Sequence, residues 1–455
     1  MSTDTIAAVS TPLAVGGLGV VRISGPDALD IGAKIFRPFG PKGVKELQGY
    51  TAAYGRVGSA GTVIDECIAL VFRAPKSYTR EDVVELSCHG GVYVVRQVLA
   101  AALGAGARLA EPGEFTKRAF LNGRIDLTRA EAVMEIISAK GELAARAAQS
   151  QREGAMFKAA QRIKRKLVDI SADISAFVDF PDEDIPGLAP DVLRGKLSEI
   201  SDALGHCVDS YGRGRLIREG VPTVIAGRPN VGKSTLMNLI SGAEKSIVTE
   251  IPGTTRDLVE ESVSFAGAVL LLTDTAGLRE PDDEVEKIGV ERARDRIAQA
   301  QLVFAVFDAS RPLDEDDQAL ICKTDPVRTV AVLNKSDLPP KIDEEYIKSK
   351  YKQTVKISAR SGEGLGGLEE VVRRLLGTVD TDPGGAMAAS ERQMECVRGA
   401  KDGVDAALAA LEGGMTLDAV STGVEQGVRE IMKLTGESAS QEIIDRVFEK
   451  FCVGK

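Results

Sequence analysis

The sequence predicts a multidomain protein in which α/β domains are combined with an all-α domain. The chain has 455 residues, which is enough for about three domains. Blocks 1–120 and 221–376 alternate strand-like apolar runs with helical patterns, whereas 128–218 and the region after 390 carry helical stripes only. One helical domain with an α/β domain inserted into it explains this order, because the ends of a domain often lie close together. Separate N- and C-terminal helical domains remain an alternative.

We expect four segments along the chain. They are an N-terminal α/β domain at 1–120, the first part of the helical domain at 121–218, an inserted α/β domain at 219–378, and the second part of the helical domain at 379–455. Thr128 with Glu131, and Ser390 with Gln393, have the spacing of helix-capping boxes. These pairs predict helix starts in both halves of the helical domain.

Composition limits the class of protein. Hydrophobic residues make up 44% and charged residues 27%, as in ordinary globular proteins. No apolar run reaches the length of a membrane span, and the N-terminus does not resemble a signal peptide. Six cysteines without a CxxC pair indicate reduced thiols and a cytoplasmic protein. The net charge of −10 excludes a uniformly basic nucleic-acid coat, and two histidines leave little scope for a multi-histidine metal site.

The strongest chemical signal is the segment GRPNVGKS at 227–234. It fits the pattern GxxxxGK(S/T), follows the apolar run Val221–Ala226 and precedes a helical pattern. This strand–loop–helix context predicts a P-loop. Backbone N–H groups of such a loop cradle phosphates, while Lys233 would reach the β- and γ-phosphates and Ser234 would bind Mg²⁺.

Further motifs follow later apolar runs and predict a Ras-like GTPase domain. In DTAG at 274–277, Asp274 would lie near the magnesium ion. In NKSD at 334–337, Asp337 would accept both N–H groups on the edge of guanine, which adenine does not offer. The segment SAR at 358–360 follows another strand. Each motif alone is weak, but their order, each at the end of a strand, predicts GTP binding and hydrolysis.

Segments outside these motifs carry a family resemblance. They are DTIAA at 4–8, GVVRISG at 19–25, HGG at 89–91, PGEFTKRAFLN at 112–122, DFPDE at 179–183 and FCVGK at 451–455. With the GTPase motifs, they make the chain resemble the MnmE (TrmE) family of tRNA-modification GTPases over essentially its whole length. That family more often ends in CIGK, and Val453 is a mild departure that removes no polar group.

The resemblance implies both cofactors and partners. The N-terminal domain would dimerise and bind a tetrahydrofolate derivative, 5-formyl- or 5,10-methylene-, through Arg22, Glu85, Arg124 and Lys455. Many relatives carry lysine at position 124, so this contact keeps its charge. A homodimer would act with an FAD-dependent partner protein, in a heterotetramer or larger assembly, on tRNA. Together they would form a (carboxymethyl)aminomethyl group at C5 of the wobble uridine, with the folate supplying the carbon.

The resemblance also assigns roles in GTP hydrolysis. Leu278 stands where many GTPases have a water-orienting glutamine, and the family uses a later glutamate that aligns with Glu286. The acid-rich segment 280–286 equally fits a solvated loop in which Glu286 is a bystander. The implied ligands of K⁺ are Asn230, Thr249, Ile251 and Thr254, and those of Mg²⁺ are Ser234 and Thr255. The residues expected to bind GTP are Asn230, Val231, Gly232, Lys233, Ser234, Thr235, Thr249, Thr254, Thr255, Asp274, Gly277, Asn334, Lys335, Asp337, Ser358, Ala359 and Arg360.

Cys452 is the remaining candidate for catalysis. It lies near Lys455 at the end of the chain, where a nucleophile for C6 of uridine is conceivable and a packing role is the alternative. An ordered terminus needs a buried helix before it. The apolar stripe of Ile443, Ile444, Val447, Phe448 and Phe451 predicts one.

A basic stripe in the helical domain is a candidate surface for tRNA phosphates. Its members are Arg152, Lys158, Arg162, Lys164, Arg165 and Lys166. A solvated helix face explains it equally well.

Two other classes of function stay open at this point. A ribosome-assembly GTPase would explain the GTPase motifs but not the segment 1–120 or the terminal CVGK. A membrane-remodelling GTPase would need an amphipathic face rich in aromatic and basic residues, which the sequence does not offer.

Overall fold

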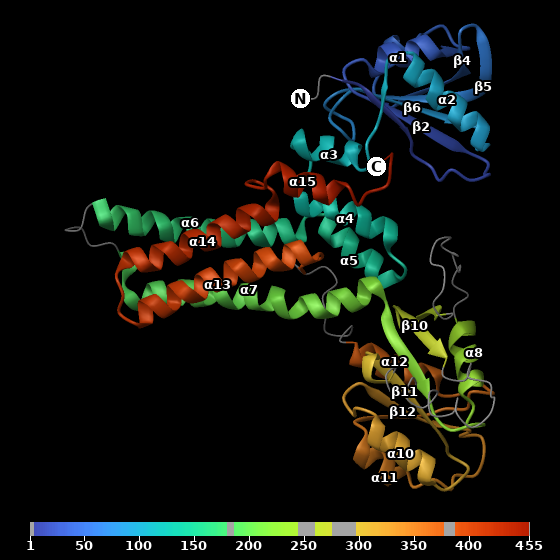
Figure 1. Ribbon diagram of the computed structural model, residues 1–455, viewed down its shortest axis with the longest axis vertical. Coiled ribbons are helices and arrows are strands. Elements are labelled where there is room, and N and C mark those ends of the chain that lie inside the picture. The colour runs from blue at the N-terminus through green and yellow to red at the C-terminus, as the bar shows by residue number, and fades with distance from the viewer. Residues whose placement is uncertain (1–3, 180–185, 244–259, 275–296, 377–386, 455) are drawn as a thin grey trace, which may run out of the picture. The chain divides into compact units, whose positions relative to one another are not determined.

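The structure is a computed structural model that describes residues 4–179, 186–243, 260–274, 297–376 and 387–454 (Figure 1). The chain forms two compact units. The first comprises Met1–Met134, Arg152–Leu204 and Ser390–Lys455, and the second comprises Glu135–Gln151 and Gly205–Ala389. None of the helices in the described ranges is both long enough and apolar enough to cross a membrane.

A seven-stranded sheet forms the N-terminal part of the first unit (Figure 1). Its strands, in spatial order, are β3 (Phe36–Pro38), β4 (Thr51–Ser59), β5 (Thr62–Phe72), β6 (Val83–Cys88), β2 (Gly19–Ser24), β1 (Ile6–Val9) and β7 (Arg108–Leu109). All neighbours are antiparallel except β1 and β7. The pairing of β2 with β6 sets Arg22 opposite Glu85.

Two helices cover this sheet with their apolar faces. α1 (Ala28–Ile35) buries Ile31 and Ile35, and α2 (Val92–Gly104) buries Val95 and Val98, in one core with strand residues. The helical pattern that the sequence shows at 92–104 is thus confirmed. A short 3₁₀ turn, Val44–Glu46, packs beside α1.

The rest of the first unit is helical. Its elements are α3 (Glu114–Leu121), α4 (Leu127–Ser138), α6 (Ala155–Asp179), a 3₁₀ turn (Pro186–Leu188), α7 (Pro190–Glu219), α13 (Glu391–Glu412), α14 (Leu417–Thr435) and α15 (Gln441–Phe448). α4 and α7 continue into the second unit, to which α5 (Glu142–Arg152) belongs except for its last residue. α6, α13 and α14 run side by side (Figure 1). Gly403 and Gly423 bring α13 and α14 into backbone contact, and Leu167 of α6 packs on Gly427. The two halves of the chain therefore build one helical domain.

One predicted helix cap is wrong. α4 begins at Leu127, and the carboxylate of Asp126 accepts from the N–H groups of Thr128 and Arg129 at 2.9 and 3.2 Å. Thr128 therefore lies inside the helix, and the predicted box with Glu131 does not form. The second predicted cap is confirmed, since Ser390 Oγ accepts from the N–H of Gln393 at 3.2 Å.

The second unit contains a six-stranded sheet with helices around it (Figure 1). Its strands, in spatial order, are β13 (Gln353–Lys356), β12 (Thr329–Asn334), β11 (Leu302–Asp308), β8 (Val221–Ala226), β10 (Ala268–Asp274) and β9 (Glu260–Phe265). Only β9 runs antiparallel to its neighbour. The helices are α8 (Lys233–Ala243), α10 (Glu315–Lys323), α11 (Glu344–Lys350) and α12 (Leu365–Leu375). β11 and β12 are buried along their whole length, as expected for central parallel strands.

Candidate functional site

The motifs that predict GTP binding meet at one edge of the second sheet. β8, β10, β11, β12 and β13 are parallel, so their carboxyl ends share that edge. The P-loop at 227–232 follows β8, Asp274 ends β10, Asn334 ends β12, and Ser358 follows β13. Ligands of open parallel sheets bind outside these carboxyl ends. The fold therefore gathers motifs that are far apart in the sequence.

The P-loop itself has the backbone geometry that its glycines predict. Gly232 has φ +98°, and a Cβ atom there would lie 2.2 Å from Asn334 Nδ2. Asn230 also adopts a left-handed conformation, with φ +66°. Lys233 Nζ donates to the carbonyl oxygens of Gly227 and Arg228, each at 2.8 Å. The ammonium group thus lies over the loop at the start of α8, where an anion is favoured by the helix N-terminus.

Asn334 holds the loops of the site together. Its Nδ2 donates to the carbonyl oxygen of Val231 at 2.7 Å, and its Oδ1 accepts from the N–H of Ala359 at 2.9 Å. The side chain is buried, so both bonds replace water that it cannot reach. The NKSD motif therefore fixes the P-loop against the SAR segment.

Lys335 is positioned by a buried carboxylate. Its backbone is left-handed, with φ +64°, and its Nζ donates to Asp308 Oδ2 at 2.6 Å. Burial alone would raise the pKa of Asp308, but bonds from Lys335 and Ser310 outweigh it and lower that pKa. The backbone of this turn is tied by the N–H of Ser336, which donates to Ile357 at 3.2 Å. This turn leaves Asp337 exposed at the mouth of the site.

The remaining residues predicted for this site are exposed, buried, or outside the part of the chain that the structure describes. Ser234, Thr235 and Arg360 are exposed beside the loops, while Ser358 and Val231 are buried. Thr249, Ile251, Thr254, Thr255, Gly277 and Glu286 lie outside the described residues, and of Asp274 only the backbone is described. Among the described residues, no cluster of three His, Cys, Asp or Glu side chains could hold a metal ion.

A second site lies in the first unit, where the sheet meets the end of the chain. Arg22 Nε donates to Glu85 Oε1 at 2.7 Å across the β2–β6 pair. Both side chains are largely buried, with 18% and 20% exposed. The carbonyl oxygen of Gly454 accepts from Arg22 Nη1 at 3.4 Å and from Ser10 Oγ at 3.3 Å. The C-terminal tail is therefore docked on Arg22, one of the residues that the family resemblance assigns to folate, beside its partner Glu85.

The backbone geometry of the tail requires glycine. Gly454 has φ +93°, and a Cβ atom there would lie 2.2 Å from the carbonyl oxygen of Val9. Val453 forms a β-bridge with Pro112, and the N–H of Gly113 donates to Cys452 at 3.3 Å. The Cys452 side chain is exposed, and Lys455 lies outside the described residues.

α15 brings the tail to this place. Ile444 and Phe448 of α15, with Phe451 after it, are buried in one cluster with Leu127 and Ala130. Ile443 and Val447 pack against the same cluster. The apolar stripe that predicts a buried terminal helix is confirmed. Burial of such side chains stabilises the docked state by roughly 1.5–3 kcal/mol each.

Comparison with known proteins decides the family. The profile of the "GTP-binding protein TrmE N-terminus" matches residues 5–124, and that of the "MnmE helical domain" matches residues 127–452. This chain belongs to the MnmE (TrmE) family. It is 42% identical over 460 residues to the tRNA modification GTPase MnmE of Thermoanaerobacter pseudethanolicus, covering 100% of both chains. It is 41% identical over 461 residues to that of Acetivibrio thermocellus, covering 99% of both.

One solved structure is similar to a part of this chain. The G domain of the T. maritima FeoB iron transporter shares 26% identity, covering 34% of this chain and 96% of that chain with a TM-score of 0.26. The predicted fold class is confirmed: an N-terminal TrmE-type α/β domain, a split MnmE helical domain and an inserted P-loop GTPase domain. The exact limits of the four segments stay a prediction, as do the individual site residues.

We call the second site, where Gly454 contacts Arg22 beside Glu85, the tail site. Sequence reasoning missed Tyr78, which belongs to the tail site of this MnmE-family chain. The guanidinium carbon of Arg22 lies 6.0 Å from the centre of its ring, and that of Arg124 lies 5.1 Å away. Arg22 also lies over Phe115, at 5.5 Å. No periodicity marks Tyr78 as special, because its neighbours come from β2 and from the segment after α3.

α3 carries the family segment PGEFTKRAFLN, and a buried charge network explains its composition. Arg118, 4% exposed, donates to the carboxylates of Asp4, Glu81 and Glu114 at 2.8–3.2 Å. Lys117 on the same helix pairs with Asp445 of α15 at 2.6 Å. α3 therefore links the N-terminal sheet to the helix that places the tail. The sequence shows these charges but not their pairing.

Arg228 in the P-loop is a further residue that the motif did not assign. Its guanidinium pairs with Asp314, the N-cap of α10, and lies 3.8 Å from Asp317. Burial raises the pKa of Asp317, and Arg228 opposes the rise. The P-loop is thereby anchored to the start of α10.

The basic stripe of the helical domain is partly paired. Lys164 pairs with Glu437, and Lys166 pairs with Glu199 at 2.6 Å. The other members are exposed; they are Arg152, Lys158, Arg162 and Arg165. The stripe as a tRNA contact stays a prediction, with fewer unpaired charges than the sequence alone indicates.

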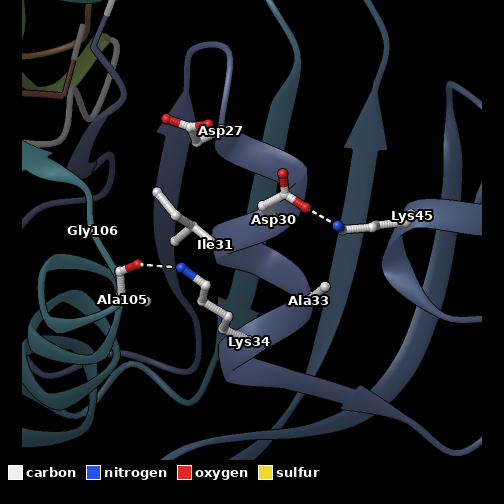
Figure 2. A pocket seen from close by; sticks show the side chains of 8 residues that line it. All are labelled: Asp27, Asp30, Ile31, Ala33, Lys34, Lys45, Ala105 and Gly106. Carbon is white, nitrogen blue, oxygen red and sulfur yellow. Dashed lines mark hydrogen bonds and ion pairs between the residues drawn. The ribbon is translucent and has the colours of Figure 1, made fainter.

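A pocket of about 540 Å³ opens on the N-terminal domain, and its lining differs from the residues predicted to bind ligands (Figure 2). Lys34 Nζ donates to the carbonyl oxygen of Ala105 at 3.1 Å, and Lys45 pairs with Asp30. Its lining residues are Asp27, Asp30, Ile31, Ala33, Lys34, Lys45, Ala105 and Gly106. None of the predicted site residues is among them, and both of its lysines already have a partner within the pocket.

Proposed function

We propose that this chain is a GTP-hydrolysing tRNA-modification protein. It acts in the cytoplasm with an FAD-dependent partner and uses the one-carbon unit of a tetrahydrofolate to form (carboxymethyl)aminomethyl at C5 of wobble uridine. Family membership supports the GTPase and the tRNA. The observation that carries the folate chemistry is the contact of Gly454 with Arg22 beside Glu85.

The residues of the tail site suit a reduced folate. Arg22 engages Oε1 of Glu85, and Oε2 would accept from the N–H groups of a pterin edge. Arg124 is exposed nearby and would bind a carboxylate of the glutamate tail. Lys455, which follows Gly454 in the sequence, would add a second cation. This chain's contribution is to orient the folate, whose own one-carbon unit is the carbon that is transferred.

The nucleotide site suits GTP with two cations. Ser234 with Thr255 would hold Mg²⁺, and Asn230 with Thr249, Ile251 and Thr254 would hold K⁺, since both are hard cations that prefer oxygen ligands. These ions would neutralise charge that develops on the phosphates. Glu286 would orient the attacking water in place of a glutamine. A homodimer would bring two GTPase domains together around this chemistry.

Analysis of wobble uridines tests the proposal. In tRNA from cells that lack the protein, the C5 modification should be absent, and a plasmid copy of the chain should restore it. Mass spectrometry of nucleosides gives the readout. If the amount of C5-modified wobble uridine were the same in cells that lack the protein as in normal cells, the proposal would be contradicted. Accumulated ribosome precursors with normal tRNA would indicate a ribosome-assembly GTPase instead.

Cys452→Ser tests the proposed nucleophile. The exposed thiol would be replaced by a hydroxyl of nearly the same shape but far lower nucleophilicity. We expect wobble modification to fall by about tenfold or more, whereas GTP hydrolysis and folate binding persist. Full modification by the variant would exclude a catalytic role for Cys452. Lost folate binding would show that the tail acts through structure alone.

A further inference from the structure

The hairpin formed by β9 and β10 in the GTPase sheet turns directly against the start of α5. Gly267, in the turn of the hairpin, has φ +82°, and a Cβ atom there would lie 3.4 Å from Leu143 Cδ1. A Cβ atom on Gly141, just before α5, would lie 3.1 Å from Val269 Cγ2. Glycines on both sides therefore let the turn and the helix approach each other closely. All four residues belong to the second unit.

A backbone hydrogen bond joins the same two elements. The N–H of Leu143 donates to the carbonyl oxygen of Gly267 at 3.4 Å. Leu143 is the second residue of α5, and the first N–H groups of a helix have no acceptor within the helix. The hairpin therefore supplies an acceptor that the start of α5 needs. Because the bond is long, a shift of the turn by about 1 Å would break it and leave this end of the helix uncapped.

The other end of α5 holds a buried polar side chain that is only half satisfied. Gln151, 3% exposed, donates from Nε2 to the carbonyl oxygen of Met387 at 2.8 Å. Its Oε1 is buried and has no hydrogen-bond partner among the described residues. A buried acceptor that stays unpaired raises the free energy of the structure. A second placement of α5 that pairs this oxygen would therefore compete with the observed one.

The strands of the hairpin connect this contact to the nucleotide site. Thr255 precedes β9 in the sequence, and β10 ends at Asp274, the first residue of DTAG. A change at the phosphates that shifts these strands is thus transmitted to the turn at their other end. Coupling between two sites typically changes an equilibrium by about 5- to 150-fold, and burial of one leucine side chain contributes a factor of similar size. The Leu143 contact is therefore large enough to carry such a coupling.

We propose that Leu143 is a positioning residue that couples the nucleotide state of the GTPase domain to α5 through the turn of the hairpin. In one nucleotide state the turn caps α5, and in the other state the cap is lost and the first turn of α5 opens. The chain passes from α5 into the first unit at Arg152, so the nucleotide would act on a helix that links the two units in sequence. The inference requires that the chain binds and hydrolyses GTP, and it is independent of the folate chemistry.

Hydrogen exchange on the full chain, with Mg²⁺ and saturating GDP or a non-hydrolysable GTP analogue, tests this coupling. In the wild type, amides at 143–151 should exchange at rates that differ by about fivefold or more between the two nucleotides. Leu143→Ala should reduce this difference to less than about twofold, while the affinity for GTP stays within about twofold of the wild type. Leu143→Met, which nearly keeps the apolar volume, should restore the difference.

Val327→Ala, at an exposed position on the same domain, is the matched control and should keep the full difference. Amides of β11 and β12 report whether each variant is folded. The inference would be overturned if the wild type showed no difference between the nucleotides, or if Leu143→Ala kept the full difference. If Leu143→Ala accelerated the exchange of α5 equally with both nucleotides and left their ratio unchanged, Leu143 would act through packing alone and the inference would be wrong.

Discussion

At the scale of single residues, Asp337 is the group that should choose the nucleotide. It is exposed at the mouth of a loop whose backbone is fixed by Asn334 and Ser336. In Asp337→Asn an amide donor would face the N–H edge of guanine, so affinity for GTP should fall by about 1.5–3 kcal/mol. Xanthosine triphosphate should become the preferred ligand. Titration with fluorescent GTP and fluorescent xanthosine triphosphate measures the two affinities. The control variant Ser336→Ala should keep the preference for GTP. Equal GTP affinity in Asp337→Asn would refute this role.

Asp308 is the residue whose ionisation should control the stability of the same loop. Its pKa is lowered in the folded protein, since Lys335 and Ser310 outweigh the effect of burial. A carboxyl with a depressed folded pKa stabilises above its unfolded value, about 3.9, and loses that contribution as pH falls through the folded value. Asp308→Asn should therefore lower the opening free energy of β11 and β12 amides by about 1–3 kcal/mol at pH 7.

Hydrogen exchange of those amides, measured at several pH values, checks this result. The difference between wild type and Asp308→Asn should shrink as pH falls below about 4. Asp316→Asn, at an exposed position on α10, should change opening little at any pH. A difference that stayed constant with pH would show that Asp308 acts through packing and not through its charge.

At the scale of elements, the sequence predicts what neighbours in the chain determine. The stripe that ends in Phe448 and Phe451 shows its buried face through spacing alone, and α15 is found there. The predicted cap at Thr128 does not form because Asp126 caps α4 instead. Glu131 pairs with Arg392 of α13, at 2.9 and 2.7 Å, a residue that follows the inserted domain in the sequence. Tyr78 is missed for the same reason, since its importance arises only when Arg22 and Arg124 converge. Partners that are distant in sequence leave no local pattern.

The tail as an element can be tested through Gly454. Gly454→Ala would place a Cβ atom against Val9 and strain a backbone with φ +93°. The tail should leave its place beside Arg22, so folate affinity and wobble modification should both fall by about tenfold. GTP hydrolysis should persist, because the GTPase motifs lie in the other unit. Val453→Ile, which keeps a β-branched apolar side chain at the neighbouring position, is the control. Normal folate binding by Gly454→Ala would show that the docked tail is dispensable.

At the scale of the whole molecule, the interrupted helical domain is the feature that sequence patterns predict well. Helical stripes on both sides of an α/β block imply a domain with an insert, and α14 indeed packs against both α13 and α6. A domain inserted at one point leaves the core of the helical domain intact, because the two ends of the inserted domain lie close together. The relation between two copies of the chain is different, because complementary surfaces leave no periodic signal in one sequence. Dimerisation therefore stays a prediction from the family, and it has a kinetic consequence.

GTP hydrolysis should depend on both the monovalent cation and the protein concentration. Leu278 cannot orient water, and Asn230 stands where a potassium ligand is expected. The rate of hydrolysis should therefore be at least about tenfold higher in K⁺ than in Na⁺. The smaller Na⁺ ion fits a ring of oxygen ligands of potassium size poorly. If two GTPase domains must meet to complete that ring, the rate per molecule should rise with concentration. Phosphate release measured in KCl and NaCl at the same concentration separates the effect of the cation from that of ionic strength.

Glu286→Ala should slow hydrolysis in KCl while leaving GTP affinity nearly intact. Equal rates in the two salts would remove potassium from the mechanism, and a concentration-independent rate would remove the encounter of two domains.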